Sequence, residues 1–472
     1  MSLPDNIADC HQIILEQRAL ISELLSRLSK VEAELTKLQQ QVAKNSKNSH
    51  KPPSSDGLKK KPAFARKRGG KRGGQVGHQG KTLELVAAPD IEIPLLPERC
   101  SCGALLDSDK ASIGERRQVF DIPPPRLEVT EYQKLVCKCG HCGLTTAGEF
   151  PESVISPTQY GSGVRAFTSL LNCGFAMPVG KIRRLFTDLF GYAINEGTIT
   201  KNNERASDLL KPVETQIKEN LIAAPLGHSD ETGMRIAGRL HWLHVFSNAL
   251  YTFFFVHTHR GKEALNDTMS ILPHYSGWVV HDCWKSYFLF KGCKHAICGA
   301  HILRELTALE EQNVVWAKSF KDYLLTLLQW SKANNGRLTA EQQRIALVSY
   351  RQICATANRI EPLPIKQKGK RGRPKATKGR NLLNRLMEHQ EAVLAFAFHS
   401  EVPFTNNLAE RDLRPMKTKQ KVSGCFRTLK GAEQHARIYG FISTVRKHQL
   451  NIFNELKKVF QEEPFSFDFA KG

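Results

Sequence analysis

The chain has 472 residues, of which 41% are hydrophobic and 24% charged. This composition excludes a fibrous or wholly disordered protein, and the length suits about three domains. The net charge of +22 makes a polyanion or an anionic membrane surface the expected partner. The most apolar stretch, 250–256, is far shorter than the roughly 20 residues that span a bilayer, so we expect no membrane partner.

Residues 1–45 carry an apolar heptad repeat, which is typical of a coiled-coil helix. The a positions of the repeat are Ile7, Ile14, Ile21, Leu28, Leu35 and Val42. The stripe predicts self-association through a zipper, and packing onto the rest of the chain is the alternative.

Most of the positive charge lies in two segments. Residues 46–82 hold eleven Lys or Arg and one acid, and residues 366–380 hold eight and no acid. The first segment is also rich in Gly, Pro and Ser, so we expect a disordered basic linker over 46–88. Such a linker would neutralise the phosphates of a nucleic acid without reading bases, or it would merely keep the chain soluble.

Two cysteine pairs within 89–150 predict a small domain that resembles a zinc ribbon, in which four thiolates bind structural Zn²⁺. The expected ligands are Cys100, Cys102, Cys139 and Cys142, with Cys137 as a competitor. Because no secretory signal is visible, we expect these thiols to be reduced rather than joined in disulfides. Chance clustering of thiols is the alternative.

Residues 156–222 are expected to be helical. Within them, 178–190 and 195–204 flank Gly191, a pattern compatible with a helix-turn-helix that reads DNA. An ordinary pair of packed helices has the same pattern, so both interpretations stay open.

The periodicity changes at 223–450. Strands are expected at 226–236, 240–247, 250–257, 277–284 and 293–298, with a helix at 262–272. Three strands, a helix, a fourth strand, a helix and a fifth strand is the order of a ribonuclease-H-like sheet. The fold class is therefore a multidomain α/β protein with a ribonuclease-H-like catalytic domain, an N-terminal coiled coil and a small zinc ribbon.

Acids on the first and fourth strands of such a sheet lie side by side, and with a third acid they hold two metal ions for phosphodiester chemistry. Asp230 and Asp282 occupy those strands, and Glu410 fits the third position at the start of a late helix. A large helical insertion at 302–400 would fill the gap before Glu410. Each acid could instead be an ordinary structural carboxylate; Glu231 and Asp412 are the nearest rivals, although alternation along the strand aims Glu231 away from Asp230.

Several basic residues accompany this acid set. The helix that begins near Glu410 continues with cations expected to meet DNA phosphates: Arg411, Arg414, Lys417, Lys419 and Lys421. Within the insertion, Arg371, Arg373 and Lys375 match an AT-hook core, which lies along a narrow minor groove, or belong to a charged linker. Residues 451–472 are expected to be a C-terminal tail.

These motifs together resemble the insertion sequence 66 family of bacterial transposases along essentially the whole chain. The resemblance rests on Asn-Ser-His-Lys-Pro-Pro-Ser-Ser-Asp-Gly at 48–57, Gly-Gly-Gln-Val-Gly-His-Gln-Gly at 73–80, Asp-Glu-Thr-Gly at 230–233, His-Asp-Cys-Trp at 281–284, Cys-Gly-Ala-His at 298–301 and Phe-Thr-Asn-Asn-Leu-Ala-Glu-Arg at 404–411. Cys100 and Cys102 depart from it, because the family usually has two residues between the first cysteines.

The resemblance implies a DNA transposase that acts on terminal inverted repeats with Mg²⁺ (or Mn²⁺), with Asp230, Asp282 and Glu410 as its catalytic triad. Cys298 and His301 resemble a Cys-x-x-His that follows the second Asp in related families. We expect them near the active site, with a second zinc site that includes Cys293 and His295 as the alternative.

The expected mechanism has two steps. Metal-activated water first frees a 3′-hydroxyl at the element's end, and that hydroxyl then attacks target DNA. The expected partners are double-stranded DNA and further copies of the chain, as a homodimer or a higher synaptic oligomer; accessory proteins of the same element are left open. A cytoplasmic, nucleoid-associated location follows. Rival interpretations are a ribonuclease-H-like nuclease without strand transfer and a zinc-containing DNA-binding regulator.

Overall fold

The computed structural model describes residues 6–42, 82–95, 97–107, 109, 111–364, 374 and 376–463. Most of the basic linker and the AT-hook residues Arg371, Arg373 and Lys375 lie outside these residues. The chain divides into two compact units, one comprising 1–58, 151–185 and 193–472 and the other comprising 59–150 and 186–192. None of the described helices is both long and apolar enough to cross a membrane.

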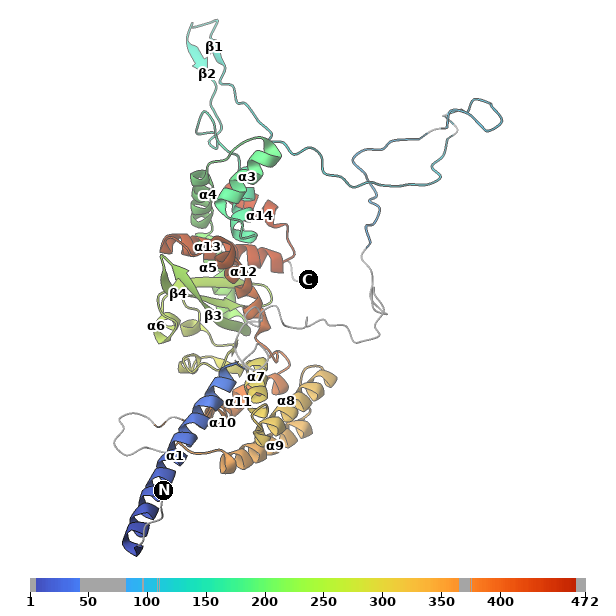
Figure 1. Cartoon of the computed structure of the whole chain (residues 1–472). Coiled ribbons are helices and arrows are strands. Elements are labelled where there is room, and N and C mark those ends of the chain that lie inside the picture. Colours follow the sequence, from blue (N-terminus) through green and yellow to red (C-terminus); the bar gives the residue numbers. More distant parts are fainter. Residues whose placement is uncertain are drawn as a thin grey trace. The chain divides into compact units, whose positions relative to one another are not determined.

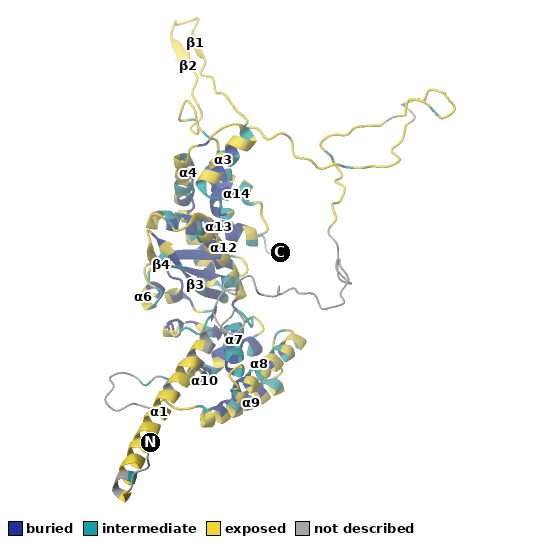
Figure 2. Cartoon of the chain, viewed as in Figure 1, coloured by how far each residue is buried: buried dark blue, intermediate teal, exposed yellow. Residues whose placement is uncertain are grey.

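The N-terminal helix α1 spans Ile7–Val42 and exposes its apolar stripe. Ile14, Ile21 and Leu28 are each about half exposed, and most of the helix is coloured as exposed in Figure 2. Exposed isoleucine and leucine at heptad spacing are what a partner helix would cover. The coiled coil therefore stays a prediction, and the exposed apolar stripe of α1 is a surface suited to it.

In the second unit the described strands form one antiparallel hairpin. Strand β1 spans Val136–Lys138 and β2 spans Thr145–Ala147, with Cys137 opposite Thr146. Both strands are exposed, so this small unit has little apolar core of its own. A unit of this kind usually needs a metal or disulfides for stability.

A helical region leads into the sheet. Its elements are α2 (Ser162–Ser169), the π-helix η3 (Leu170–Gly174), α3 (Val179–Phe190), α4 (Glu196–Leu209) and α5 (Lys211–Ala223). Helix α3 ends at Gly191, whose φ of 72° is easy only for glycine. The side chain of Asn195 then caps α4 by accepting from the amide of Gly197. These signals produce a helix, a turn and a helix, and DNA reading by them stays a prediction.

Five strands form the central sheet in the order β5-β4-β3-β6-β7. Its strands β3 and β4 are labelled in Figure 1. They are β3 (Leu226–Ile236), β4 (Arg239–Ser247), β5 (Thr252–His257), β6 (Trp278–His281) and β7 (Lys294–Ile297). The first three are antiparallel neighbours, whereas β6 runs parallel to β3 and β7 parallel to β6. Positive φ angles at Ala237 and Gly238 make the tight β3–β4 turn that this right-twisted hairpin requires.

The helix expected at 262–272 is much shorter in the structure, so that prediction was wrong in length. Helix α6 covers only Lys262–Leu265. The side chain of Asp267 accepts a hydrogen bond from the amide of Met269 at 2.8 Å, which competes with helical bonding. Pro273 follows within the 3-10 helix η4 (Leu272–His274) and also opposes a longer helix.

Helices fill the region between β7 and the last part of the chain. They are α7 (Gly299–Glu310), α8 (Val315–Ala333), α9 (Ala340–Ile360), α10 (Lys378–Glu388) and α11 (Gln390–Phe398), and they share one apolar core with Ala296 and Ile297 of β7. After them come α12 (Asn407–Ser423), α13 (Leu429–Lys447) and α14 (Ile452–Phe460).

The two faces of the sheet are both covered. Met234 and Val245 of the central strands pack against α12 and α13, whereas Phe253 and Phe255 pack in a second core with α5 and part of α13. Figure 2 shows β3 and β4 as largely buried. Because α12 packs directly on β3, the sheet determines where the first turn of α12 lies.

Candidate active site

Asp230 lies on β3, and Asp282 directly follows β6, the parallel neighbour of β3. In the β3–β6 register His228 is the partner of Val280, and continuing two residues along both strands pairs Asp230 with the residue directly after β6, Asp282. Glu410 lies in the first turn of α12, the helix that packs on β3. The three acids therefore come from β3, from the residue after β6, and from a helix that packs on β3.

The electrostatics of these acids show that they influence one another. Burial raises the pKa of Asp230 well above its ordinary value, and the negative charge of Glu231 raises it further. The charges of Asp282 and Glu410 also raise the pKa of Asp230. Burial, followed by the charge of Glu231, raises the pKa of Asp282 to about 7, although Arg260 opposes this rise. Crowded carboxylates of this kind favour a proton or a bound cation.

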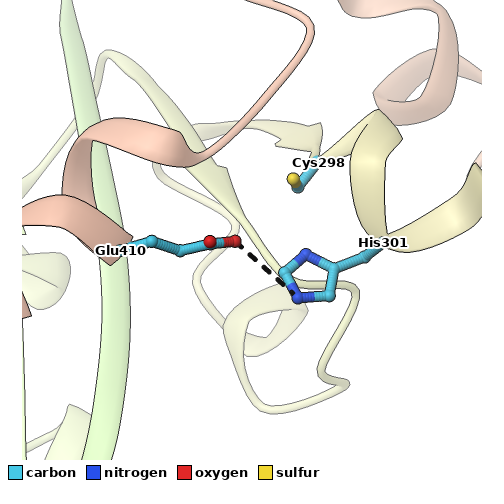
Figure 3. Close-up of side chains that lie close together, drawn as sticks. All are labelled: Cys298, His301 and Glu410. Atoms are coloured by element: carbon cyan, nitrogen blue, oxygen red, sulfur yellow. Dashed lines mark ion pairs between the residues drawn. The ribbon is translucent and has the colours of Figure 1, made fainter. Parts of the chain in front are cut away.

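Glu410 also faces His301 of α7 and Cys298, which directly precedes that helix, as Figure 3 shows. Its Oε1 lies 3.9 Å from Nε2 of His301. Potential metal-ligand atoms of Cys298, His301 and Glu410 all lie within 4.8 Å of one another, and within the described part of the chain no other group of three such side chains is this close. The Oε1 atom of Glu410 is buried and accepts no hydrogen bond from any described residue.

Cys293 and His295 lie apart from this group. The Sγ of Cys293 is 3.8 Å from Nε2 of His295, and Nδ1 of His295 lies 3.1 Å from Nε2 of His281. The four side chains considered for a second zinc site therefore do not form one group. Cys298 and His301 lie near Glu410, whereas Cys293 and His295 lie near His281.

The start of α12 is held by the buried side chain of Asn406. Its Nδ2 donates to the carbonyl of Ser229 at 2.8 Å, and its Oδ1 lies 2.9 Å from Nδ1 of His228. The amide of Asn406 donates to Sγ of Cys298 at 3.1 Å. Asn406 thereby ties the helix that carries Glu410 to the strand that carries Asp230 and to the N-terminus of α7.

Glu231 has partners other than the acids. Its side chain is fully buried, and Oε2 accepts a hydrogen bond from the hydroxyl of Tyr287 at 2.5 Å. Its Oε1 pairs with the guanidinium of Arg260 at 2.6 and 2.7 Å. Both carboxylate oxygens of Glu231 are therefore satisfied by protein groups, unlike Oε1 of Glu410.

The acid set suits a hard divalent cation. Mg²⁺ and Mn²⁺ prefer carboxylate oxygens, which Asp230, Asp282 and Glu410 all offer. Among the described residues, the oxygens of these three acids do not all lie within 4.8 Å of one another. A cation would relieve the mutual repulsion that raises the pKa of Asp230, and it would satisfy the buried Oε1 of Glu410. The chemistry of these donors therefore suits such a metal.

The cations predicted on α12 divide into two groups. Arg411, Arg414, Lys417 and Lys421 are exposed. Lys419 is buried, and its ammonium group donates to the carbonyl of Asn172 at 3.3 Å. The prediction that Lys419 meets phosphates is therefore corrected: it lies on the packed face of α12, which spacing from Glu410 alone did not reveal.

The cysteines of the second unit form two similar turns. The amide of Cys100 donates to the carbonyl of Ala104, and the amide of Cys139 donates to that of Leu144. Hydrogen bonds involving Cys102 lower the pKa of Cys100, and hydrogen bonds involving Cys142 lower that of Cys139. Thiols with lowered pKa values on two matched turns fit Zn²⁺. Among the described residues the four thiols are not all gathered within 4.8 Å.

Sequence reasoning missed the roles of two residues here. Asn406 stood in a motif that was noted, but no local pattern assigned its side chain a partner 177 residues away. Arg260 stood in a short polar loop after β5, where a charged residue is ordinarily solvated. Only their tertiary contacts distinguish these two residues from ordinary solvated polar residues.

Comparison with protein-family models gave three matches. Residues 157–434 match the family described as Transposase IS66 family, and residues 97–143 match the zinc-finger binding domain of transposase IS66. Residues 5–84 match a family of unknown function. A search of curated proteins gave no match.

Proposed function

The chain belongs to the IS66 family of transposases, and we propose that it cuts and joins DNA at the terminal inverted repeats of a mobile element by metal-dependent phosphoryl transfer. In this proposal Asp230, Asp282 and Glu410 are the catalytic acids that bind Mg²⁺ or Mn²⁺. The supporting observation is that the charges of Asp282 and Glu410 both act on Asp230, although the acids are distant in sequence.

We further propose that residues 223–450 form a ribonuclease-H-like domain. The strand order β5-β4-β3-β6-β7 supports this, with three antiparallel strands followed by two parallel ones. The same order supports the placement of the acids, because carboxyl ends of parallel neighbours meet at one edge of a sheet. The helices α7–α11 would then be an insertion between the second and third acids.

The side chains of the chain would do four things in the reaction. Asp230 and Asp282 hold the cations at the sheet edge, and Glu410 closes the site from α12. His301 offers a nitrogen beside Glu410, and Asn406 keeps α12 docked on β3. When bound, the divalent cations supply Lewis-acid polarisation of the phosphodiester and lower the pKa of the attacking oxygen. Protons compete with the cations for these acids, and burial raises the pKa of Asp282, so the reaction should need more Mg²⁺ as pH falls.

Other parts of the chain would hold DNA and pair its ends. The exposed cations Arg411, Arg414, Lys417 and Lys421 extend away from Glu410 along α12 and can meet phosphates. The second unit would bind Zn²⁺ through Cys100, Cys102, Cys139 and Cys142 and contribute to DNA binding. Helix α1 would join two subunits, one for each end of the element. Accessory proteins remain outside this proposal.

The deciding experiment uses labelled duplexes that carry the ends of the element encoding this chain, with a supercoiled plasmid as target. Wild-type protein with Mg²⁺ or Mn²⁺ should cut the end and join it to the plasmid. Asp230→Asn and Glu410→Gln should keep duplex binding but lose both reactions. The matched control is Asp322→Asn, because Asp322 is an exposed acid on α8 that pairs with Lys318.

Each alternative function predicts another pattern. A nuclease cuts the labelled end but never joins it, whereas a regulator binds the duplex, cuts nothing and is unaffected by Asp230→Asn. If the acid variants cut as fast as Asp322→Asn, then the catalytic assignment of Asp230 and Glu410 is wrong.

A further inference from the structure

Arg260 is a cation held rigidly beside the acids. Its Nε and Nη2 both bond to Oε1 of Glu231, at 2.7 and 2.6 Å. The guanidinium lies over two tryptophan rings, with its Cζ 5.1 Å from the ring centre of Trp242 and 4.3 Å from that of Trp284. A carboxylate and two aromatic rings therefore fix both the position and the plane of this group.

The guanidinium nevertheless keeps unused donors. Of its five N–H groups, Glu231 takes one on Nε and one on Nη2, and within the described residues Nη1 donates no hydrogen bond. The nearest other acid oxygen is Oδ2 of Asp282 at 3.7 Å, which is too long for a hydrogen bond. The side chain is still 38% exposed, so a ligand can reach it.

The charge balance shows why a strand of DNA would need such a group. Asp230, Glu231, Asp282 and Glu410 place negative charge around the site, and a phosphodiester is also negative. Arg260 is the cation that the structure places in direct ionic contact with this set. Since Arg is a planar fork that suits phosphate oxygens, a fixed Arg with free donors is well matched to a backbone phosphate.

We propose that Arg260 binds one backbone phosphate of the DNA strand that enters the acid cluster, and that Glu231, Trp242 and Trp284 hold it in position for this contact. This rests on the proposed function. In this arrangement Glu231 is a positioning residue rather than a metal ligand, because both of its oxygens are already used by Tyr287 and Arg260.

A purely structural ion pair would have different consequences. It would stabilise the fold, but the contribution of each DNA phosphate to binding would be the same with and without Arg260. A phosphate contact instead makes one phosphate dependent on Arg260. The test must therefore resolve single phosphates.

The probe is the element-end duplex used above, carrying a neutral methylphosphonate at one position at a time along the strand to be cut. Binding is measured in EDTA, so that no strand is cut, with wild type, Arg260→Gln and Arg260→Lys. The matched control is Arg235→Gln, which removes one exposed arginine from the same strand as Asp230. Thermal unfolding of each variant checks folding.

We expect Arg260→Gln to weaken binding about tenfold or more, and to reduce the slope of log K against log salt by about 0.9, the value for one phosphate. In wild type a methylphosphonate at the contacted position should weaken binding to a similar extent, and in Arg260→Gln it should have no further effect. Arg260→Lys should show a reduced effect at that position, because Lys keeps the charge but not the fork. Arg235→Gln should keep the wild-type profile.

If the methylphosphonate profiles of wild type and Arg260→Gln run parallel at every position, the proposed contact does not exist. Should Arg260→Gln fail to fold because Glu231 is left as a buried unpaired charge, the double variant Glu231→Gln with Arg260→Gln removes that charge and is scanned instead. If wild type does not bind the end duplex at all, the proposed function fails, and that result is distinct from parallel profiles.

Discussion

Replacing Asp282 with Asn should stabilise the metal-free protein at neutral and alkaline pH. The pKa of Asp282 rises from 3.8 to about 7 in the folded state, so this carboxyl keeps its proton longer when folded than when unfolded. Stability from this group is greatest below pH 4 and is lost as pH rises from about 4 to about 7. Asn mimics the neutral acid, so the variant should not lose stability through this group as pH rises.

The magnitude follows from the same pKa. A tenfold change in proton affinity corresponds to about 1.4 kcal/mol, so a rise from 3.8 to about 7 corresponds to at most about 4 kcal/mol. The side chain is 25% exposed, and solvent screening reduces the effect. We therefore expect Asp282→Asn to be more stable than wild type by about 2 to 4 kcal/mol at pH 8 in EDTA, and by much less at pH 5.

Urea unfolding followed by tryptophan fluorescence measures this difference selectively, because all five tryptophans lie between residues 242 and 330. Saturating Mg²⁺ should then stabilise wild type, by about 2.7 kcal/mol at a hundred times the dissociation constant, and should stabilise Asp282→Asn less. Parallel stability curves for the two proteins between pH 5 and pH 8 in EDTA would refute the reasoning.

Two further predictions address the surroundings of the acids, and a third addresses helix α1. Asn406→Leu removes hydrogen bonds to Ser229 and His228 and should destabilise the fold by about 2 to 4 kcal/mol in urea unfolding, while lowering end cutting even at temperatures where the protein is folded. Asp412→Asn removes the carboxylate that pairs with the buried ammonium of Lys447 at 2.8 Å and leaves it only the carbonyls of Asn248 and Tyr251. It should destabilise by about 3 kcal/mol, opposite in sign to Asp282→Asn, and an equally stable variant would contradict this. Deleting residues 1–44 should leave the tryptophan-reported unfolding unchanged but convert an oligomer to a smaller species in light scattering, and an unchanged oligomer would remove the role proposed for α1.

The element types in residues 223–450 followed largely from local sequence pattern. Alternating and aromatic runs predicted strands close to those observed at β3, β4 and β5. The local sequence is informative here because side chains alternate between the two faces of a strand. The spacing between Asp230 and Asp282 was informative for the same reason, since Asp230 lies on β3 and Asp282 directly follows β6, strands whose order could be inferred. The length of α6 could not be predicted in this way. The side chain of Asp267 accepts a hydrogen bond from the amide of Met269, which competes with the helical hydrogen bonds that the apolar pattern predicted.

By itself the sequence determined the family resemblance and the heptad stripe of α1, and it selected the acids that we propose as catalytic, since these depend on residue identity and spacing. Only the tertiary structure decided that Lys419 is buried, that Asn406 joins α12 to β3, and that Arg260 lies between two tryptophans beside Asp282. Each of these depends on which side chains from distant segments meet when the sheet and its helices pack. Local patterns encode which face of an element is apolar, but they do not encode which partner covers that face.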